Sequence, residues 1–281
     1  FFNRNETLAG KTLGDDPQRQ APFFNRQYGA RLGGAIVKDK LFFFVNAEQQ
    51  VAETPFLINL VNQATLDGFG GNVPSNVSRV SIEEAQQVKD YLMTNYNYDP
   101  GSFGSFAPQT KNNKLFGKID WNINDRHQLT LRHSFLKATD ENLSRTQNVL
   151  EFTNNGYLND VTSNSTILEL RSRLTDNVAN NLIVGYTTID RQRNLDDYGP
   201  LFPHIDIYTT NNTTIRAGSQ RSSVGNELRQ GIGQLTNNLT IFKNRHVITL
   251  GTHNEFFNIY NSFVNRFNGH YEYNGMENFL A

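Results

Sequence analysis

Apolar and polar residues alternate with a period of two in eight stretches of the chain, which group as four pairs. The clearest pair places Leu115, Ile119 and Trp121 on one face of a strand and Lys118 and Asp120 on the other. Strict alternation is typical of a strand whose two faces meet different surroundings. It predicts strands over 27–37, 41–52, 113–123, 127–137, 162–174, 179–191, 228–242 and 246–260, with a ninth over 269–281.

Very short and very long connections join these strands in turn. Within a pair the turn is about three polar residues, as at 38–40 and 124–126, whereas the pairs are separated by 53–110, 139–160 and 193–226. A chain threaded through a membrane as strands has short turns on one side and long loops on the other. A β-sandwich has no reason for this asymmetry. We therefore expect an all-β fold, a segment of a large antiparallel transmembrane β-barrel with long extracellular loops.

The last pair breaks the alternation. Ile248 and Leu250 occupy even positions, but Phe257 and Ile259 occupy odd ones. A β-bulge inserts one residue and exchanges the two faces of a strand. We expect such a bulge between residues 251 and 255.

One short helix is predicted inside the longest loop. Ser81 and Glu84 have the spacing of a capping box at a helix start. Apolar residues then recur at helical spacing, at Ile82, Ala85, Val88, Tyr91 and Leu92. We expect this helix to end between 95 and 101 and to pack over the outer rim of the barrel.

The composition agrees with a membrane strand protein. Hydrophobic residues make up only 37% of the chain, yet aromatic residues reach 12%. In a large barrel one strand face meets lipid, the other lines a wet lumen, and aromatic residues collect at the membrane interfaces. Trp121, on the apolar face beside a short turn, is predicted to lie in such an interface girdle. No apolar run is long enough for a membrane-spanning helix.

Candidate enzyme chemistry is missing from the sequence. There is no Cys, and none of the six His residues forms a helical zinc pair with another. We expect no catalytic, cofactor or metal site, and no enzyme activity. His204 and Asp206 fall in an outer loop, where we expect solvated side chains. The net charge of -1 argues against a nucleic-acid partner.

Several segments resemble Oar-like TonB-dependent receptors, a type of outer-membrane receptor and transporter found in Bacteroidota. Residues 28–44, YGARLGGAIVKDKLFFF, are similar to the hairpin pattern FGxxLGGPIxKDKLFFF of that family, with Ala35 in the place of its Pro. Residues 5–12 resemble its NExLxGKT segment, and 114–121 and 269–280 resemble two of its later strands. The resemblance implies an energy-coupled importer with a barrel of about 22 strands.

The same resemblance implies partners and a location. The family lies in the cell outer membrane, against the lipid bilayer and lipopolysaccharide, and carries an N-terminal plug that a TonB-type protein acts on. Outer-membrane lipoproteins are possible further partners. We expect the plug and the C-terminal strands to lie outside this chain, and the chain to be part of one barrel domain.

Charged residues on the polar strand faces are the candidate site. A charge facing lipid at mid-depth costs about 2–4 kcal/mol, so these residues are predicted to face the lumen. They either contact the plug or simply keep the lumen wet. The candidates are Arg31, Glu48, Lys118, Asp120, Arg132, Glu169, Arg171 and Arg173.

Four functions remain open at this point. TonB-dependent import of a bulky substrate ranks first, and a passive porin-like channel second; a plug in the complete protein would separate them. A structural or surface-interaction role ranks third. A soluble β-rich binding protein ranks last, and it predicts solubility without detergent.

Overall fold

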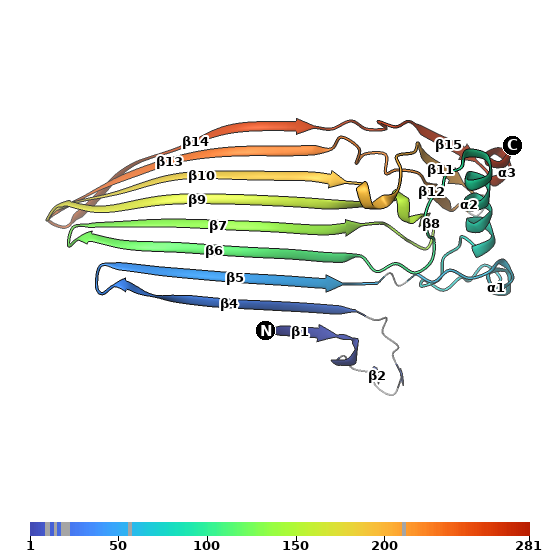
Figure 1. Cartoon of the computed structure of the whole chain (residues 1–281), viewed down its shortest axis with the longest axis horizontal. Coiled ribbons are helices and arrows are strands. Elements are labelled where there is room, and N and C mark those ends of the chain that lie inside the picture. The colour runs from blue at the N-terminus through green and yellow to red at the C-terminus, as the bar shows by residue number, and fades with distance from the viewer. Residues whose placement is uncertain (9–11, 14–15, 18–22, 56–57, 210–211) are drawn as a thin grey trace.

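The chain folds into a long open sheet, and a body of ordered loops lies at one end of it (Figure 1). The computed structural model describes residues 1–8, 12–13, 16–17, 23–55, 58–209 and 212–281. Parts of the expected 5–12 segment and of two expected loops, residues 9–11, 56–57 and 210–211, lie outside the described residues. Within the described residues the large sheet has nine strands in the order β1-β4-β5-β6-β7-β9-β10-β13-β14. All its pairings are antiparallel.

Eight long strands occupy the stretches where alternation was found, and most run a few residues further at the outer end. Their bounds are β4 (Phe24–Val37), β5 (Leu41–Glu53), β6 (Gln109–Asn124), β7 (His127–Asn142), β9 (Tyr157–Thr175), β10 (Val178–Asn194), β13 (Glu227–Lys243) and β14 (His246–Ser262). The extra length comes from backbone pairing that continues beyond the alternating residues. β1 (Phe2–Asn5), which pairs with β4, was not predicted because four residues are too few to show a period.

The hairpins are closed by turns of two or three residues, at 38–40, 125–126, 176–177 and 244–245. Asp39 and Asn244 adopt the left-handed region, with φ of 61° and 56°. Asp and Asn enter this region more readily than most residues, and tight hairpin turns require it. These turns set the register of the long strands.

The expected bulge near residues 251–255 is wrong. β13 and β14 pair without a shift from Lys243 opposite His246 to Glu227 opposite Ser262. Phe257 and Ile259 therefore point to the polar face, and Phe256 continues the apolar face of Ile248. Apolar residues on the polar face, rather than a backbone insertion, break the alternation. Register shifts occur elsewhere, between 35 and 37, 122 and 124, and 178 and 179, each close to a short turn.

The large sheet has no protein core of its own. Among the described residues, no hydrophobic side chain of the eight long strands is buried, and Leu32 and Leu250 are 64% and 63% exposed. Soluble proteins rarely leave so large an apolar surface uncovered. Something other than this chain must therefore cover the apolar face. No helix in the described part is both long and apolar enough to cross a membrane.

We call the loops at the far end of the sheet the outer cap: residues 54–108, 143–156, 195–226 and 263–281, as far as they are described. The cap contains a second sheet in the order β15-β11-β12-β8. Its strands are β8 (Val149–Glu151), β11 (His204–Tyr208), β12 (Thr214–Ala217) and β15 (His270–Asn274), and its helices are α1 (Gln63–Gly68), α2 (Ile82–Tyr96) and α3 (Met276–Leu280).

Helix α2 covers one face of the cap sheet. Its Val88 and Leu92 belong to a buried apolar core that includes Ile207 and Ile215 of the sheet. The helix was expected to pack over the outer rim of the barrel; it lies at the end of the large sheet where the long loops gather and packs there on the cap sheet (Figure 1). Ile82, expected on the apolar stripe, is exposed.

The predicted capping box at the start of α2 is confirmed. Ser81 Oγ accepts a hydrogen bond from the Glu84 backbone N–H at 3.2 Å, and Glu84 Oε2 accepts one from the Ser81 N–H at 2.9 Å. Asn97, with φ of 51°, ends the helix in a left-handed cap. Local spacing alone therefore specified both the start of α2 and its approximate end.

Residues 269–281 do not form a ninth barrel strand. The five residues of β15 pair in parallel with β11 of the cap sheet. Gly275, with φ of 102°, then leads the chain into α3, and Phe279 packs in the cap core. The segment carries strand-like residues, but its pairing partner lies far away in the sequence.

Removing the capping hydroxyl should loosen the cap without disturbing the large sheet. We expect Ser81→Ala to cost about 1 kcal/mol locally, because one first-turn N–H loses its acceptor. Hydrogen exchange of the α2 amides should then accelerate by about fivefold. Thr94→Ala, an exposed change on the same helix, is the control and should not accelerate exchange. Equal behaviour of the two variants would contradict the role of the capping box.

Candidate lumenal site

The polar face of the large sheet carries a cavity of about 330 Å³ between strands β5, β6, β7 and β9. Five of the eight predicted charged residues line it: Lys118, Asp120, Arg132, Glu169 and Arg171. Side chains two apart on one strand and opposite on the next strand share a face, and this brings the five together. For example, Lys118 pairs in register with Arg132, and Thr130 pairs with both Asp120 and Glu169.

Ion pairs inside this cavity leave a positive surplus. Lys118 Nζ lies 2.8 Å from Asp120 Oδ2, and Arg171 Nε lies 2.8 Å from Glu169 Oε1. Thr130 Oγ1 donates a hydrogen bond to Asp120 Oδ1 at 2.8 Å. Arg132 has no ion pair or side-chain hydrogen bond within the described part of the chain. Three cations against two anions among the lining residues give a formal charge of +1.

The other three candidates lie outside this cavity. Glu48 forms an ion pair with Lys114, whose Nζ is 2.8 Å from Glu48 Oε1. Lys114 was not singled out in the sequence. It lies four residues before Lys118 on the same strand and therefore on the same polar face, and this spacing would have identified it. Arg31 makes no ion pair with any residue that the structure describes.

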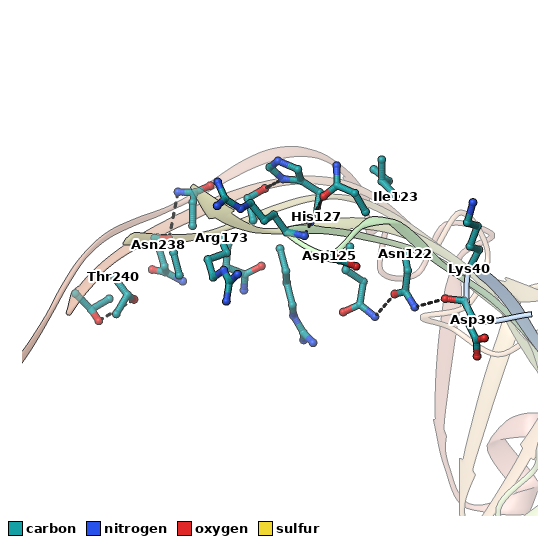
Figure 2. A pocket seen from close by; sticks show the side chains of 18 residues that line it. Asp39, Lys40, Asn122, Ile123, Asp125, His127, Arg173, Asn238 and Thr240 are labelled. Carbon is teal, nitrogen blue, oxygen red and sulfur yellow. Dashed lines mark hydrogen bonds between the residues drawn. The ribbon is translucent and has the colours of Figure 1, made fainter. Parts of the chain in front are cut away.

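Arg173 lines a second hollow of about 1040 Å³ beside the short turns. Figure 2 shows Asn122 and Asn238 on the inner side of the arched sheet and Ile123 on the outer side. Asn122 Nδ2 donates a hydrogen bond to the Asp39 carbonyl at 3.1 Å, and Gln128 Nε2 donates one to Asn122 Oδ1 at 3.2 Å. The inner side of the sheet is therefore polar from the turns up to the charged cavity.

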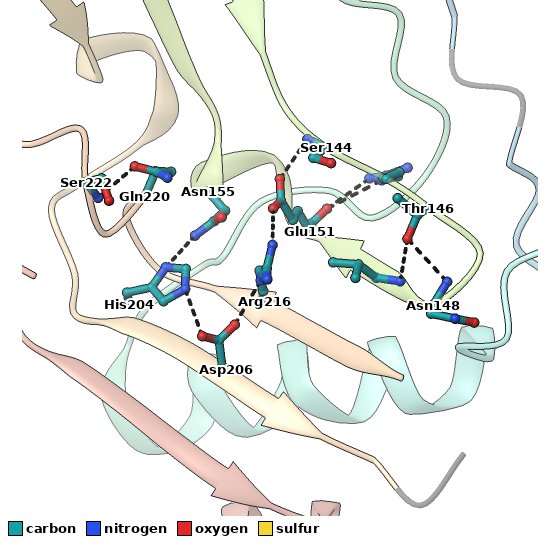
Figure 3. Close-up of polar contacts among 12 residues, drawn as sticks. Ser144, Thr146, Asn148, Glu151, Asn155, His204, Asp206, Arg216, Gln220 and Ser222 are labelled. Carbon is teal, nitrogen blue, oxygen red and sulfur yellow. Dashed lines mark hydrogen bonds and ion pairs between the residues drawn. The ribbon is translucent and has the colours of Figure 1, made fainter. Parts of the chain in front are cut away.

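A second polar cluster lies in the outer cap, where His204 and Asp206 were expected to be solvated. That expectation is wrong, because both belong to β11 and are only 3% and 1% exposed. Arg216 Nε lies 2.9 Å from Asp206 Oδ1, and Arg216 Nη1 lies 3.0 Å from Glu151 Oε1 (Figure 3). His270 Nε2 lies 2.8 Å from Asp206 Oδ2.

These contacts decide the charge of Asp206. Burial acts to raise the pKa of Asp206, but hydrogen bonds from His204, His270 and Arg216 outweigh it and hold that pKa well below its usual range. Burial likewise acts to lower the pKa of Arg216, and the carboxylates of Glu151 and Asp206 raise it. Asp206 and Arg216 are therefore both charged at neutral pH. The sequence signal was present, since His-x-Asp at 204–206 and His-x-Glu at 270–272 share one spacing, but their pairing was not visible.

Comparison with known proteins settles what the large sheet is. Residues 1–280 match the family described as "Outer membrane beta barrel domain". The chain belongs to this family. The chain is therefore part of an outer-membrane β-barrel, in a lipid bilayer environment that suits its apolar face. That the polar face lines the lumen stays a prediction. The family is typically not enzymatic.

Two solved structures are similar to this barrel domain. The outer-membrane transporter YddB from Escherichia coli matches with a TM-score of 0.51 and 11% identity over 88% of this chain. The chain spans 27% of that transporter. The CymD monoaromatic hydrocarbon channel matches with a TM-score of 0.25 and 7% identity, over 86% of this chain and 71% of that one. No curated protein matches the sequence.

Trp121 lies on the lipid-facing side of this barrel domain, opposite Leu41 and Leu129 on the neighbouring strands. It is half-exposed and close to the 125–126 turn. Trp side chains favour the membrane–water interface because they combine an apolar ring with one N–H donor. Its place in an aromatic girdle stays a prediction.

The assignment of faces can be tested with one substitution made at two neighbouring positions. Leu168 faces lipid and Ile167 faces the lumen at the same depth on β9, as their partners Leu131 and Arg132 on β7 indicate. We expect Leu168→Arg to lower the free energy of unfolding in lipid vesicles by about 2–4 kcal/mol, and Ile167→Arg by less than about 1 kcal/mol. Denaturant titration of the complete protein measures both. The reverse order would mean that the two faces are exchanged.

Proposed function

We propose that the complete protein is a TonB-dependent transporter that imports a bulky substrate across the outer membrane. The observation that carries this proposal is the charged lumenal cavity with its surplus cation. Charges are stable there only if water or another polar group meets them. A plug that fills the barrel supplies such groups.

The likeness to an outer-membrane transporter supports the proposal. This chain corresponds to about a quarter of that protein's length, so a wide barrel with room for a plug is compatible with it. The fold of the chain also supports a wide barrel, because eight long strands form an arched sheet whose two edges, β1 and β14, do not meet. In this proposal the eight lumenal charged residues are candidate plug contacts, and Trp121 anchors the barrel at the interface.

A passive porin-like channel is the second candidate. A wet, charged lumen is compatible with it, and the sizes of the two lumenal hollows do not distinguish the two functions. A role in binding at the cell surface is the third candidate, and the ordered outer cap favours it. An irregular loop surface with its own buried core can present a rigid binding face.

Conductance of the complete protein in a planar bilayer separates import from passive diffusion. We expect no steady conductance from the intact protein, because a plug blocks the lumen. Deletion of the predicted N-terminal plug should open a stable conductance. A steady open channel in the intact protein would instead support the porin-like alternative. Specific binding of the periplasmic part of a TonB-type protein to the intact form would support energy coupling.

The surplus cation provides a residue-level test. We expect Arg132→Ala to increase leak conductance of the intact protein several-fold, because a plug carboxylate loses its partner (about 1–3 kcal/mol for a hydrogen bond to a charged group). Arg126→Ala is the matched control. Arg126 sits in a short turn, is exposed, and is 3.9 Å from its only described ion-pair partner, Asp176. Equal leak in both variants would contradict a plug contact at Arg132.

A further inference from the structure

Two short motifs of the same form lie side by side in the outer cap. β11 carries His204-Ile205-Asp206, and β15 carries His270-Tyr271-Glu272. The two strands are parallel, with His204 opposite His270 and Asp206 opposite Glu272. Residues two apart on a strand share a face. Four metal-ligating side chains therefore occupy neighbouring positions on one face, opposite the one that Ile205 and Ile207 turn to the core.

The potential ligand atoms converge on a single point. Both imidazoles direct Nε2 at the same carboxylate oxygen, Asp206 Oδ2, with distances of 3.4 Å from His204 and 2.8 Å from His270. One ligand atom from each of the three residues lies within 4.8 Å of the others. Two ligands of a tetrahedral zinc ion are roughly 3.3 Å apart. Small side-chain movements therefore suffice to admit an ion.

The surroundings hold the ligands as a metal centre requires. Arg216 Nε binds Asp206 Oδ1, so that Oδ2 is the carboxylate oxygen turned to the two imidazoles and available to coordinate an ion between them. The Ser219 carbonyl oxygen lies 3.2 Å from His204 Nδ1 and can accept its N–H, so that Nε2 keeps its lone pair. The Asn155 amide nitrogen, 2.9 Å from the same Nδ1, favours the other tautomer in the empty site. Metal binding would thus replace the hydrogen bond from His204 Nε2–H to Asp206, and the ring proton of His204 would move to Nδ1.

The charge balance also favours a cation. Arg216 forms ion pairs with Asp206 and Glu151, the charge of Arg145 acts on Glu151, and Glu272 lies beside His270. These three carboxylates and two guanidinium groups give a formal charge of -1 with neutral imidazoles. Glu272 is half-exposed and its Oε1 lies 3.6 Å from His270 Nε2. It can therefore act as a fourth ligand at the solvent side, where an ion would enter.

We propose that His204, Asp206 and His270, with Glu272 as a fourth ligand, form a site for a first-row divalent cation such as Zn²⁺ that joins β15 to β11 in the outer cap. Two imidazoles with carboxylate oxygens suit zinc and its neighbours, whereas calcium and magnesium prefer oxygen ligands alone. The ion would link segments 64 residues apart in the sequence and hold the chain after β14 on the cap. This inference does not depend on the transport function.

Zinc binding to the complete detergent-purified protein tests the site. After chelator treatment, we expect one Zn²⁺ to rebind per chain, as measured by calorimetry and elemental analysis. His270→Asn and Asp206→Asn should each weaken the affinity by roughly 100-fold or more. At zinc concentrations about 100-fold above the dissociation constant, hydrogen exchange of the β15 amides should slow by roughly 100-fold.

His253→Asn is the matched control, because His253 and Glu255 repeat the same motif on β14. Their neighbours on β13 are Thr236 and Gln234 instead of a second ligand pair. This variant should bind zinc as the wild type does. Failure of the wild type to retain zinc, or equal affinity in His270→Asn, would overturn the proposal and leave a purely hydrogen-bonded cluster.

A measurement on the wild-type protein tests the site without relying on variants that could misfold. X-ray absorption of the zinc-loaded complete protein should show two imidazole ligands together with oxygen ligands. A spectrum with one imidazole or none would place the ion elsewhere and would equally overturn the assignment.

Discussion

The absence of water in the hydrocarbon layer is the constraint on which the large sheet depends. Each backbone N–H and C=O at that depth needs a partner within the protein, and antiparallel pairing provides one for every residue of an inner strand. In this open sheet β14 and β1 keep one unpaired side each, and so does β4 beyond Gln27, because β1 pairs only with residues 24–27. Unpaired edges of this kind are unfavourable in lipid, because no water is there to bind the free N–H and C=O groups.

The same constraint reverses the usual location of the core. Lipid covers the apolar strand face, so no hydrophobic side chain needs to be buried between the long strands. The described core lies entirely outside them, and its centre is the cap, where Phe152, Leu92, Ile207 and Ile215 are fully buried. The cap stands in water and obeys the ordinary rule for soluble domains. Two parts of one chain thus fold in different surroundings, the long strands in lipid and the cap in water. The boundary lies near the outer ends of the long strands.

Strand length links these two parts. A tilted strand crosses the membrane in about 9–11 residues, whereas β9 has 19. At about 3.3 Å per residue β9 is roughly 63 Å long. The excess lets the wall continue beyond the bilayer and carry the cap. The cap holds a buried charged network, with Arg216 between Asp206 and Glu151, beyond the outer ends of the long strands.

Local pattern in the sequence determined the long strands, the short turns, the division of each strand into an apolar and a polar face, and the capping box of α2. Each depends on residues within one or two turns or along one strand, where side-chain period and backbone conformation are directly coupled. Five of the eight lumenal charged residues also meet as neighbours, because adjacent strands pair in the register that the turns impose.

The tertiary structure alone decided the rest. The alternation alone could not show that β14 has no bulge and that Phe257 therefore lies on the polar face. Only the pairing of Phe257 with Ile232 in an unshifted register shows this. The alternation also could not show that residues 270–274 leave the wall, or that His204 and His270 meet around Asp206. Those contacts join segments brought together by the closing of long loops, and no short-range period records them.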